Sequence, residues 1–246
     1  MLELRDVRKS YGKVTVTDGL SLAIEPNELR AIIGPNGAGK TSLIAQISGE
    51  LRSDSGEIVF NGRSLNAMSM PARRRLGISR TFQITSLLRD FSALDNVRLA
   101  VQALDGRKRS AFASARGDAL STRAAAELVE FVGLAERADI IVSHLAHGEQ
   151  RQLELAVALA GSPPLLLLDE PTAGMASDDA IRVKNLIASI KGSRTVLLIE
   201  HDMPTVFALA DRVTVLVNGR EIATDTPDQV RRNEQVRASY LGDDDA

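Results

Sequence analysis

The sequence has no cysteine among its 246 residues, which excludes disulfide bonds and thiolate metal sites. It also has no excess of positive charge, because 30 lysines and arginines are set against 32 aspartates and glutamates, for a formal net charge of −2. Proteins that bind nucleic acid usually carry a basic patch and a basic balance, so no nucleic-acid partner is expected.

Long apolar runs are missing as well. The longest strongly apolar run is the four leucines 165–168, which are followed by Asp169 and Glu170. A membrane-spanning helix needs about 20 apolar residues, so we expect that the chain does not cross a bilayer, although it can sit against a protein that does. The first residues, MLELRDVRKSYGK, contain no apolar stretch typical of a secretory signal, and no such signal is expected.

The composition is that of an ordinary globular protein, with 44% hydrophobic and 25% charged residues. We expect strands in LELRDV, VTVTDGLSLAIE, 29–34, LLLLDE and TVLLIE, helices at about 39–49, 178–191 and 203–210, and hairpins in EIVFNGRSL and RVTVLVNGREIAT. Buried strands that alternate with helices predict the α/β class with a parallel core. The Asn-Gly pair in each hairpin predicts a tight turn between antiparallel strands.

The middle of the chain has a different character. Helical periodicity is present in STRAAAELVEFVGL and EQRQLELAVALA, whereas DGRKRSAFASARGDALS, residues 105–121, is predicted to be a loop with a solvated basic cluster. We therefore expect a single domain over 1–246. In it, 1–84 and 161–246 form the α/β core with antiparallel strands, and 85–160 form an inserted helical sub-domain.

The stretch GPNGAGKT, residues 34–41, matches G-x-x-x-x-G-K-[ST] between an apolar strand and a helix. Its glycines allow the backbone to approach phosphate, and backbone N–H groups at a helix start bind anions. Lys40 is expected to reach the β- and γ-phosphates and the Thr41 hydroxyl to ligate Mg²⁺. The predicted nucleotide-binding residues are Gly34, Pro35, Asn36, Gly37, Ala38, Gly39, Lys40, Thr41 and Ser42.

The stretch LLLLDE supplies a second part of this site. An apolar strand that ends in Asp169 places a carboxylate at the carboxyl edge of the sheet, where ligands bind in such folds. Asp169 is predicted to hold Mg²⁺, largely through water. Glu170 is predicted to orient or deprotonate an attacking water.

The order of GPNGAGKT, RTFQ, LAHGEQ, LLLLDEPTAG and IEHD resembles the nucleotide-binding subunit of an ATP-binding cassette (ABC) transporter over essentially the whole chain. This resemblance implies an ATPase with ATP and Mg²⁺ as cofactors. It also implies a P-loop NTPase (RecA-like) core with an antiparallel β sub-domain and an inserted α-helical sub-domain.

The segment LAHGE resembles the signature motif of that family, usually Leu-Ser-Gly-Gly-Gln. The resemblance implies that Leu145, Ala146, His147, Gly148 and Glu149 face the γ-phosphate of ATP held by a second subunit. Because Ala146 replaces serine, one hydroxyl donor to that phosphate is absent, and such a bond contributes about 1.5–3 kcal/mol. The family's coupling aspartate is likewise replaced by Ala176, which puts equal rates at the two sites in doubt.

Three further positions carry a role only through the resemblance. Tyr11 falls where the family stacks an aromatic ring on adenine, although it also fits an ordinary hairpin tyrosine. Gln83 in RTFQ resembles the glutamine that touches Mg²⁺ and the attacking water, and the segment after it is expected to face the membrane subunit. His201 resembles the histidine that contacts the γ-phosphate. With Lys40 and Glu170, Gln83 and His201 complete the predicted catalytic set.

ISRTFQITSLLRDFSALDNVRLAVQAL, HGEQRQLELA, DEPTAGM and VRASYLG resemble the branched-chain amino-acid importers of this family. That group implies two transmembrane permease subunits, a periplasmic substrate-binding protein, a second ATPase subunit, and a peripheral place at the cytoplasmic face of the inner membrane. Three alternatives stay open. They are a lipopolysaccharide-export ATPase, a catalytically slow ATP-binding partner subunit, and a soluble ATP switch that acts on DNA or ribosomes.

Overall fold

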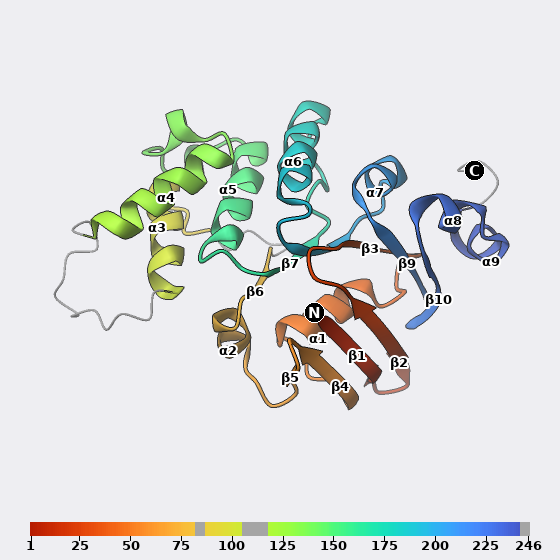
Figure 1. Cartoon of the computed structure of the whole chain (residues 1–246). Helices are drawn as coiled ribbons and strands as arrows, with labels where there is room; N and C mark the ends of the chain where they lie inside the picture. Colours follow the sequence, from red (N-terminus) through yellow and green to blue (C-terminus); the bar gives the residue numbers. More distant parts are fainter. Residues whose placement is uncertain (82–86, 105–117, 242–246) are drawn as a thin grey trace. The chain divides into compact units, whose positions relative to one another are not determined.

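The computed structural model describes residues 1–81, 87–104 and 118–241 (Figure 1). By its internal contacts the chain divides into two compact units. The first comprises Met1–Arg80, Pro164–Pro171 and Ile187–Ala246, and the second comprises Thr81–Pro163 and Thr172–Leu186. No helix within the described ranges is long and apolar enough to span a membrane.

The first unit is built on a six-stranded sheet in the order β10-β9-β3-β8-β7-β6. Its strands are β3 (Leu29–Ile33), β6 (Ile78–Arg80), β7 (Leu165–Asp169), β8 (Thr195–Ile199), β9 (Arg212–Val217) and β10 (Arg220–Asp225). All neighbours pair in parallel except β9 and β10, which form an antiparallel hairpin. The central strands β3, β7 and β8 are buried along their whole length, as parallel strands covered on both faces should be. The predicted α/β core is confirmed.

An antiparallel sheet in the order β2-β1-β4-β5 belongs to the same unit. It is formed by β1 (Leu2–Tyr11), β2 (Val14–Ile24), β4 (Ser55–Phe60) and β5 (Arg63–Ser64). The turn between β4 and β5 is Asn61-Gly62, and both residues have positive φ, at 49° and 75°. The β9–β10 turn repeats this with Asn218-Gly219 at 50° and 76°, which is the conformation that favours Asn-Gly in tight hairpins.

The helix α1 (Lys40–Ser48) provides much of the core of the first unit. Its Leu43, Ile44 and Ile47 are fully buried and cluster with apolar side chains of β7 and β8. The helix ends at Gly49, whose φ of 89° and N–H bond to the Ala45 carbonyl close the last turn. The other helices described in this unit are α2 (Met70–Arg75), α7 (Met203–Leu209), α8 (Pro227–Arg232) and α9 (Glu234–Val236), followed by a π-helical turn, η4 (Arg237–Leu241).

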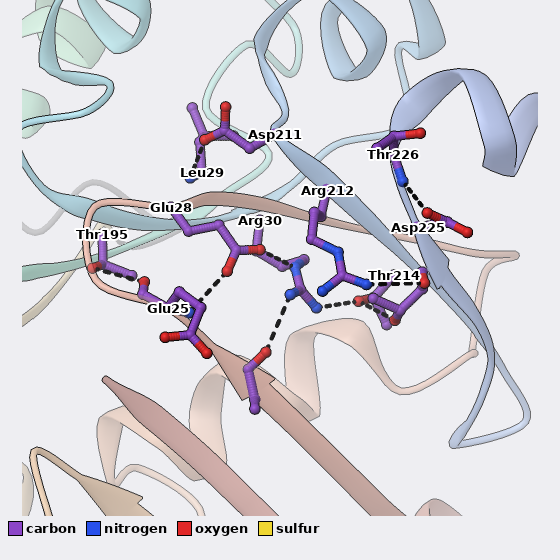
Figure 2. A network of polar contacts seen from close by, with 12 residues as sticks. Glu25, Glu28, Leu29, Arg30, Thr195, Asp211, Arg212, Thr214, Asp225 and Thr226 are labelled. Carbon is purple, nitrogen blue, oxygen red and sulfur yellow. Dashed lines mark hydrogen bonds and ion pairs between the residues drawn. The ribbon is translucent and has the colours of Figure 1, made fainter.

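The strand that leads to GPNGAGKT carries a buried arginine, Arg30, which is 1% exposed. Figure 2 shows its network: Nε donates to Glu28 Oε1 at 2.6 Å, one terminal nitrogen donates to Thr214 Oγ1 at 3.0 Å, and the other donates to the Ala23 carbonyl at 3.1 Å. A buried charge is tolerated only when it is paired and hydrogen-bonded. The network therefore ties β3 to β9 and to the end of β2.

The second unit is helical, with α3 (Ala93–Leu104), α4 (Ala119–Phe131), α5 (His147–Leu159), the greater part of α6 (Ser177–Ile190) and two 3₁₀ turns, η2 (Ala135–Arg137) and η3 (Val142–His144). The predicted loop 105–121 is wrong at its end, because α4 already begins at Ala119. Asp118 caps this helix, since its carboxylate accepts from the Ser121 N–H at 3.4 Å and also from the Ser121 hydroxyl at 2.7 Å. The rest of that predicted loop, 105–117, lies outside the described residues.

Candidate nucleotide site

The loop 34–39 joins β3 to α1 and needs glycine at two of its positions. Gly34 and Gly39 have φ of 147° and 99°, in the region that side chains rarely adopt. A Cβ at Gly34 would lie 2.0 Å from the Leu216 carbonyl oxygen, and a Cβ at Gly39 would lie 2.0 Å from that of Val16. The loop is therefore packed directly on the backbone of β9 and β2.

Lys40 is the first residue of α1 and is 8% exposed. Its Nζ donates to the carbonyls of Gly34 at 2.6 Å and Pro35 at 3.0 Å. Burial lowers the pKa of Lys40, while Glu170 and Asp169 act to raise it. The ammonium thus lies over the loop that precedes it, at the positive end of a helix dipole, in an arrangement suited to bind phosphate.

The other predicted residues of the loop differ in exposure. Asn36, Gly37 and Thr41 are exposed, Pro35, Gly39 and Ser42 are half-buried, and Ala38 is buried. Gly39 caps α1 without a side-chain hydrogen bond, and no acidic residue stands in the first turn. An anion at this helix start would meet no negative side chain from the helix itself.

Asp169 ends β7 and is 2% exposed. Its Oδ2 accepts a hydrogen bond from Arg80 at 3.0 Å, whereas Oδ1 is buried without a hydrogen-bond partner in the described chain. Burial raises the pKa of Asp169, and Arg80 opposes this shift. A buried, unpartnered carboxylate oxygen fits a hard divalent cation. Within the described ranges, no group of three or more acidic or histidine side chains is placed to hold a metal ion by itself. Mg²⁺ commonly uses one or two carboxylates together with substrate phosphates.

Glu170 and His201 come together at the carboxyl ends of the neighbouring strands β7 and β8. His201 Nδ1 lies 3.9 Å from Glu170 Oε1, and the His201 side chain is 62% exposed. Glu170 has a φ of 47°, and its N–H donates to the Ile199 carbonyl at 2.9 Å. A left-handed backbone at a residue with a side chain is costly and is typical of functional sites.

Arg80 is the member of this site that sequence reasoning missed. It ends β6, its side chain is 7% exposed, and it forms ion pairs with both Asp169 and Glu50. The available signal was its position in SRTFQ, three residues before Gln83. Gln83 itself lies outside the described residues.

Tyr11 stands at the end of β1 and is 55% exposed. Lys9 Nζ lies 5.5 Å from the centroid of its ring. The exposed ring is compatible with stacking on a base, and that role stays a prediction.

The segment 145–149 opens α5 in the second unit. Leu145 and Gly148 are buried, and Ala146 and His147 are exposed. The Ala146 N–H donates to Glu149 Oε2 at 2.9 Å, and Arg137 Nε lies 3.1 Å from Glu149 Oε1. Alanine has no side-chain acceptor, so only the glutamate half of a capping box is present. Asp179 packs tightly on Gly148, where a Cβ would lie 2.2 Å from its Oδ2.

Comparisons with known proteins agree with this architecture. The family model described as ABC transporter matches residues 17–173, and a second model, described as branched-chain amino acid ATP-binding cassette transporter, matches residues 220–246. This chain belongs to the ABC transporter family and is an ATP-hydrolysing nucleotide-binding cassette.

Relatives of two kinds span the whole chain. The high-affinity branched-chain amino acid transport ATP-binding proteins LivG of Escherichia coli and BraF of Pseudomonas aeruginosa are each 34% identical over 252 residues, covering 99% of this chain and 98% of the relative. The lipopolysaccharide export system ATP-binding protein LptB of Haemophilus influenzae is 32% identical over 244 residues, with the same coverage.

Solved structures show the same fold. A nucleotide-free ATP-binding cassette from an ABC transporter has a TM-score of 0.85 at 26% identity and covers 99% of both chains. The ADP conformation of an ATP-binding cassette from an ABC transporter has a TM-score of 0.83 at 27% identity with the same coverage. The predicted P-loop NTPase class is confirmed.

Proposed function

We propose that this chain is the ATPase subunit of a bacterial importer for branched-chain or related amino acids. The observation that carries the proposal is the match of residues 220–246 to the branched-chain amino acid model. It is supported by the two 34% identical relatives, which cover the full chain. The lipopolysaccharide-export relative, at 32% identity, keeps an exporter as the second candidate.

In the proposed mechanism, the loop 34–39 and Lys40 hold the phosphates, and the backbone N–H groups at the start of α1 neutralise their charge. Thr41, Asp169 and Gln83 would hold Mg²⁺, which would neutralise charge on the transferred phosphoryl group. Asp169 Oδ1, buried and without a partner in the described chain, supports that placement.

Glu170 is the proposed base. Its carboxylate would orient the attacking water and accept its proton, while His201 would contact the γ-phosphate. The 3.9 Å between Glu170 Oε1 and His201 Nδ1 supports two groups that act on the same reacting atoms. Positioning and charge stabilisation are the main sources of rate enhancement in phosphoryl transfer.

The proposed partners follow from the family. Members of this family work with membrane permeases, and we propose two permease subunits, a second ATPase subunit, and a periplasmic binding protein that acts indirectly. Ala146 and His147 are exposed at the start of α5, which supports a role for Leu145–Glu149 against the nucleotide of the second subunit. The chain would then lie peripherally at the cytoplasmic face of the inner membrane.

Purification with native partners tests this proposal. The tagged full chain carrying Glu170→Gln, which should slow hydrolysis, is isolated from membranes of its source organism with Mg-ATP, and bound proteins are identified by mass spectrometry. We expect the permease subunits of an amino-acid importer. Recovery of lipopolysaccharide-export proteins instead would favour the second candidate, and recovery of ribosomes or DNA-bound proteins would contradict a transport role.

A further inference from the structure

Arg80 joins two parts of the nucleotide site. It stands at the end of β6, which pairs in parallel with β7 (Figure 1), with Arg80 opposite Leu167. One terminal nitrogen donates to Asp169 Oδ2 at 3.0 Å, and the other is ion-paired with Glu50. Because the Arg80 and Asp169 side chains are 7% and 0% exposed, solvent screens the contact between them little.

The two carboxylates that Arg80 holds belong to different elements. Asp169 ends a central strand, whereas Glu50 directly follows Gly49, the residue that closes α1. The same helix begins with Lys40 and Thr41. One rigid guanidinium, which can serve two carboxylates at once, therefore fixes the Asp169 carboxylate relative to the helix that carries the proposed phosphate and metal ligands.

The two carboxylate oxygens of Asp169 have different surroundings in this geometry. Oδ2 is taken by Arg80, and Oδ1 has no hydrogen-bond partner within the described chain. We propose that Arg80 is a positioning residue of the nucleotide site, which anchors Asp169 through Oδ2 and so keeps Oδ1 available to a divalent cation. The inference rests on the proposed function, since it takes Asp169 to be the metal-binding carboxylate.

A competing role has the opposite consequence. If Arg80 only neutralised Asp169, its positive charge would repel a cation, and its removal would strengthen metal binding. If it positions Asp169, its removal weakens metal binding, because a carboxylate without its outer partner loses its orientation. Outer partners of metal ligands typically contribute about 10- to 100-fold to metal affinity.

The test is a titration of the full chain with Mn²⁺ in the presence of the non-hydrolysable nucleotide AMP-PNP, with free Mn²⁺ measured by electron paramagnetic resonance. We expect Arg80→Ala to weaken Mn²⁺ binding by about 10-fold or more. Nucleotide binding in EDTA should be unchanged, because Arg80 acts on the carboxylate and not on phosphate. Arg80→Lys keeps the charge but not the two-sided fork, so it should give an intermediate affinity.

Two further variants make the result decisive. Arg123→Ala removes an arginine that is 82% exposed on α4, and it should leave Mn²⁺ binding unchanged. Thermal unfolding of each variant confirms that it is folded. Unchanged or stronger Mn²⁺ binding in Arg80→Ala, with weaker binding in Asp169→Asn, would overturn the proposed role of Arg80 but not the metal site at Asp169. Unchanged binding in Asp169→Asn would overturn the proposed metal site and this inference with it.

Discussion

At the scale of single residues, Asp169 and Glu170 are neighbours with different surroundings. Asp169 is 2% exposed and paired with Arg80, whereas the Glu170 side chain is 31% exposed beside His201. A buried, anchored carboxylate suits a fixed ligand, and a carboxylate that reaches solvent suits an exchange of protons with water. The different surroundings of two acidic residues therefore support different roles.

The role of Glu170 gives the first prediction. Glu170→Gln keeps the shape of the side chain but removes the proposed base, so phosphate release should fall by about 10²- to 10⁴-fold. Binding of ATP, measured with a fluorescent analogue, should remain. Glu127→Gln, an exposed change on α4, serves as the control. Equal and negligible rates in the native chain and in Glu170→Gln would instead indicate a catalytically quiet partner subunit.

The loop glycines give a second prediction at this scale. Gly37 and Gly39 both have positive φ, so alanine at either position should cost about 1–2 kcal/mol in the free energy of unfolding. Only at Gly39 does the new Cβ also meet backbone, 2.0 Å from the Val16 carbonyl oxygen, which should add about 1–3 kcal/mol. Urea unfolding of the two variants measures the difference, and equal losses would contradict the packing described for the loop.

At the scale of elements, the sequence predicted best the fully buried central strand and the helix that ends in glycine. The strand predicted at 29–34 is β3 (Leu29–Ile33), and the helix predicted at 39–49 is α1 (Lys40–Ser48). Continuous apolar runs define such strands, and a glycine after the last turn defines the end of such a helix.

The elements that were missed are short or depend on distant partners. The strand β6 has only three residues, too few to show a period, and it is a strand because it pairs with β7, far along the chain. Arginine usually lies at the surface of a protein, and only the fold brings Arg80 next to Asp169 and Glu50. The predicted loop 105–121 extends past the true start of α4, because the capping role of Asp118 was not recognised in the sequence.

The start of α5 gives a prediction for an element. Ala146 is the N-cap residue and lacks a side-chain acceptor, so Ala146→Ser should add a capping bond and raise the free energy of unfolding by about 1 kcal/mol. Ala126→Ser, the same change within α4, is the matched control, and there it should lower stability by about 0.5 kcal/mol. A loss of stability in Ala146→Ser would contradict the prediction that the first N–H groups of α5 lack a side-chain acceptor.

At the scale of the whole molecule, the proposed role of Leu145–Glu149 requires a second chain whose bound nucleotide this segment would face. With hydrolysis slowed by Glu170→Gln, Mg-ATP should hold two copies together, because the α5 start is formed and exposed despite Ala146. Light scattering should show a rise from 26.5 kDa to the mass of a dimer. A persistent monomer that still binds ATP would mean that the segment serves a different ATPase subunit.

The central claim, an ATPase that drives import of branched-chain amino acids, is tested most directly by transport. The gene is deleted in its source organism, and uptake of radiolabelled leucine is measured after complementation with the native chain, Glu170→Gln or Glu127→Gln. The account predicts that uptake is lost on deletion, restored by the native chain and by Glu127→Gln, and not restored by Glu170→Gln. Normal leucine uptake in the deletion strain, together with a defect in lipopolysaccharide export, would contradict it.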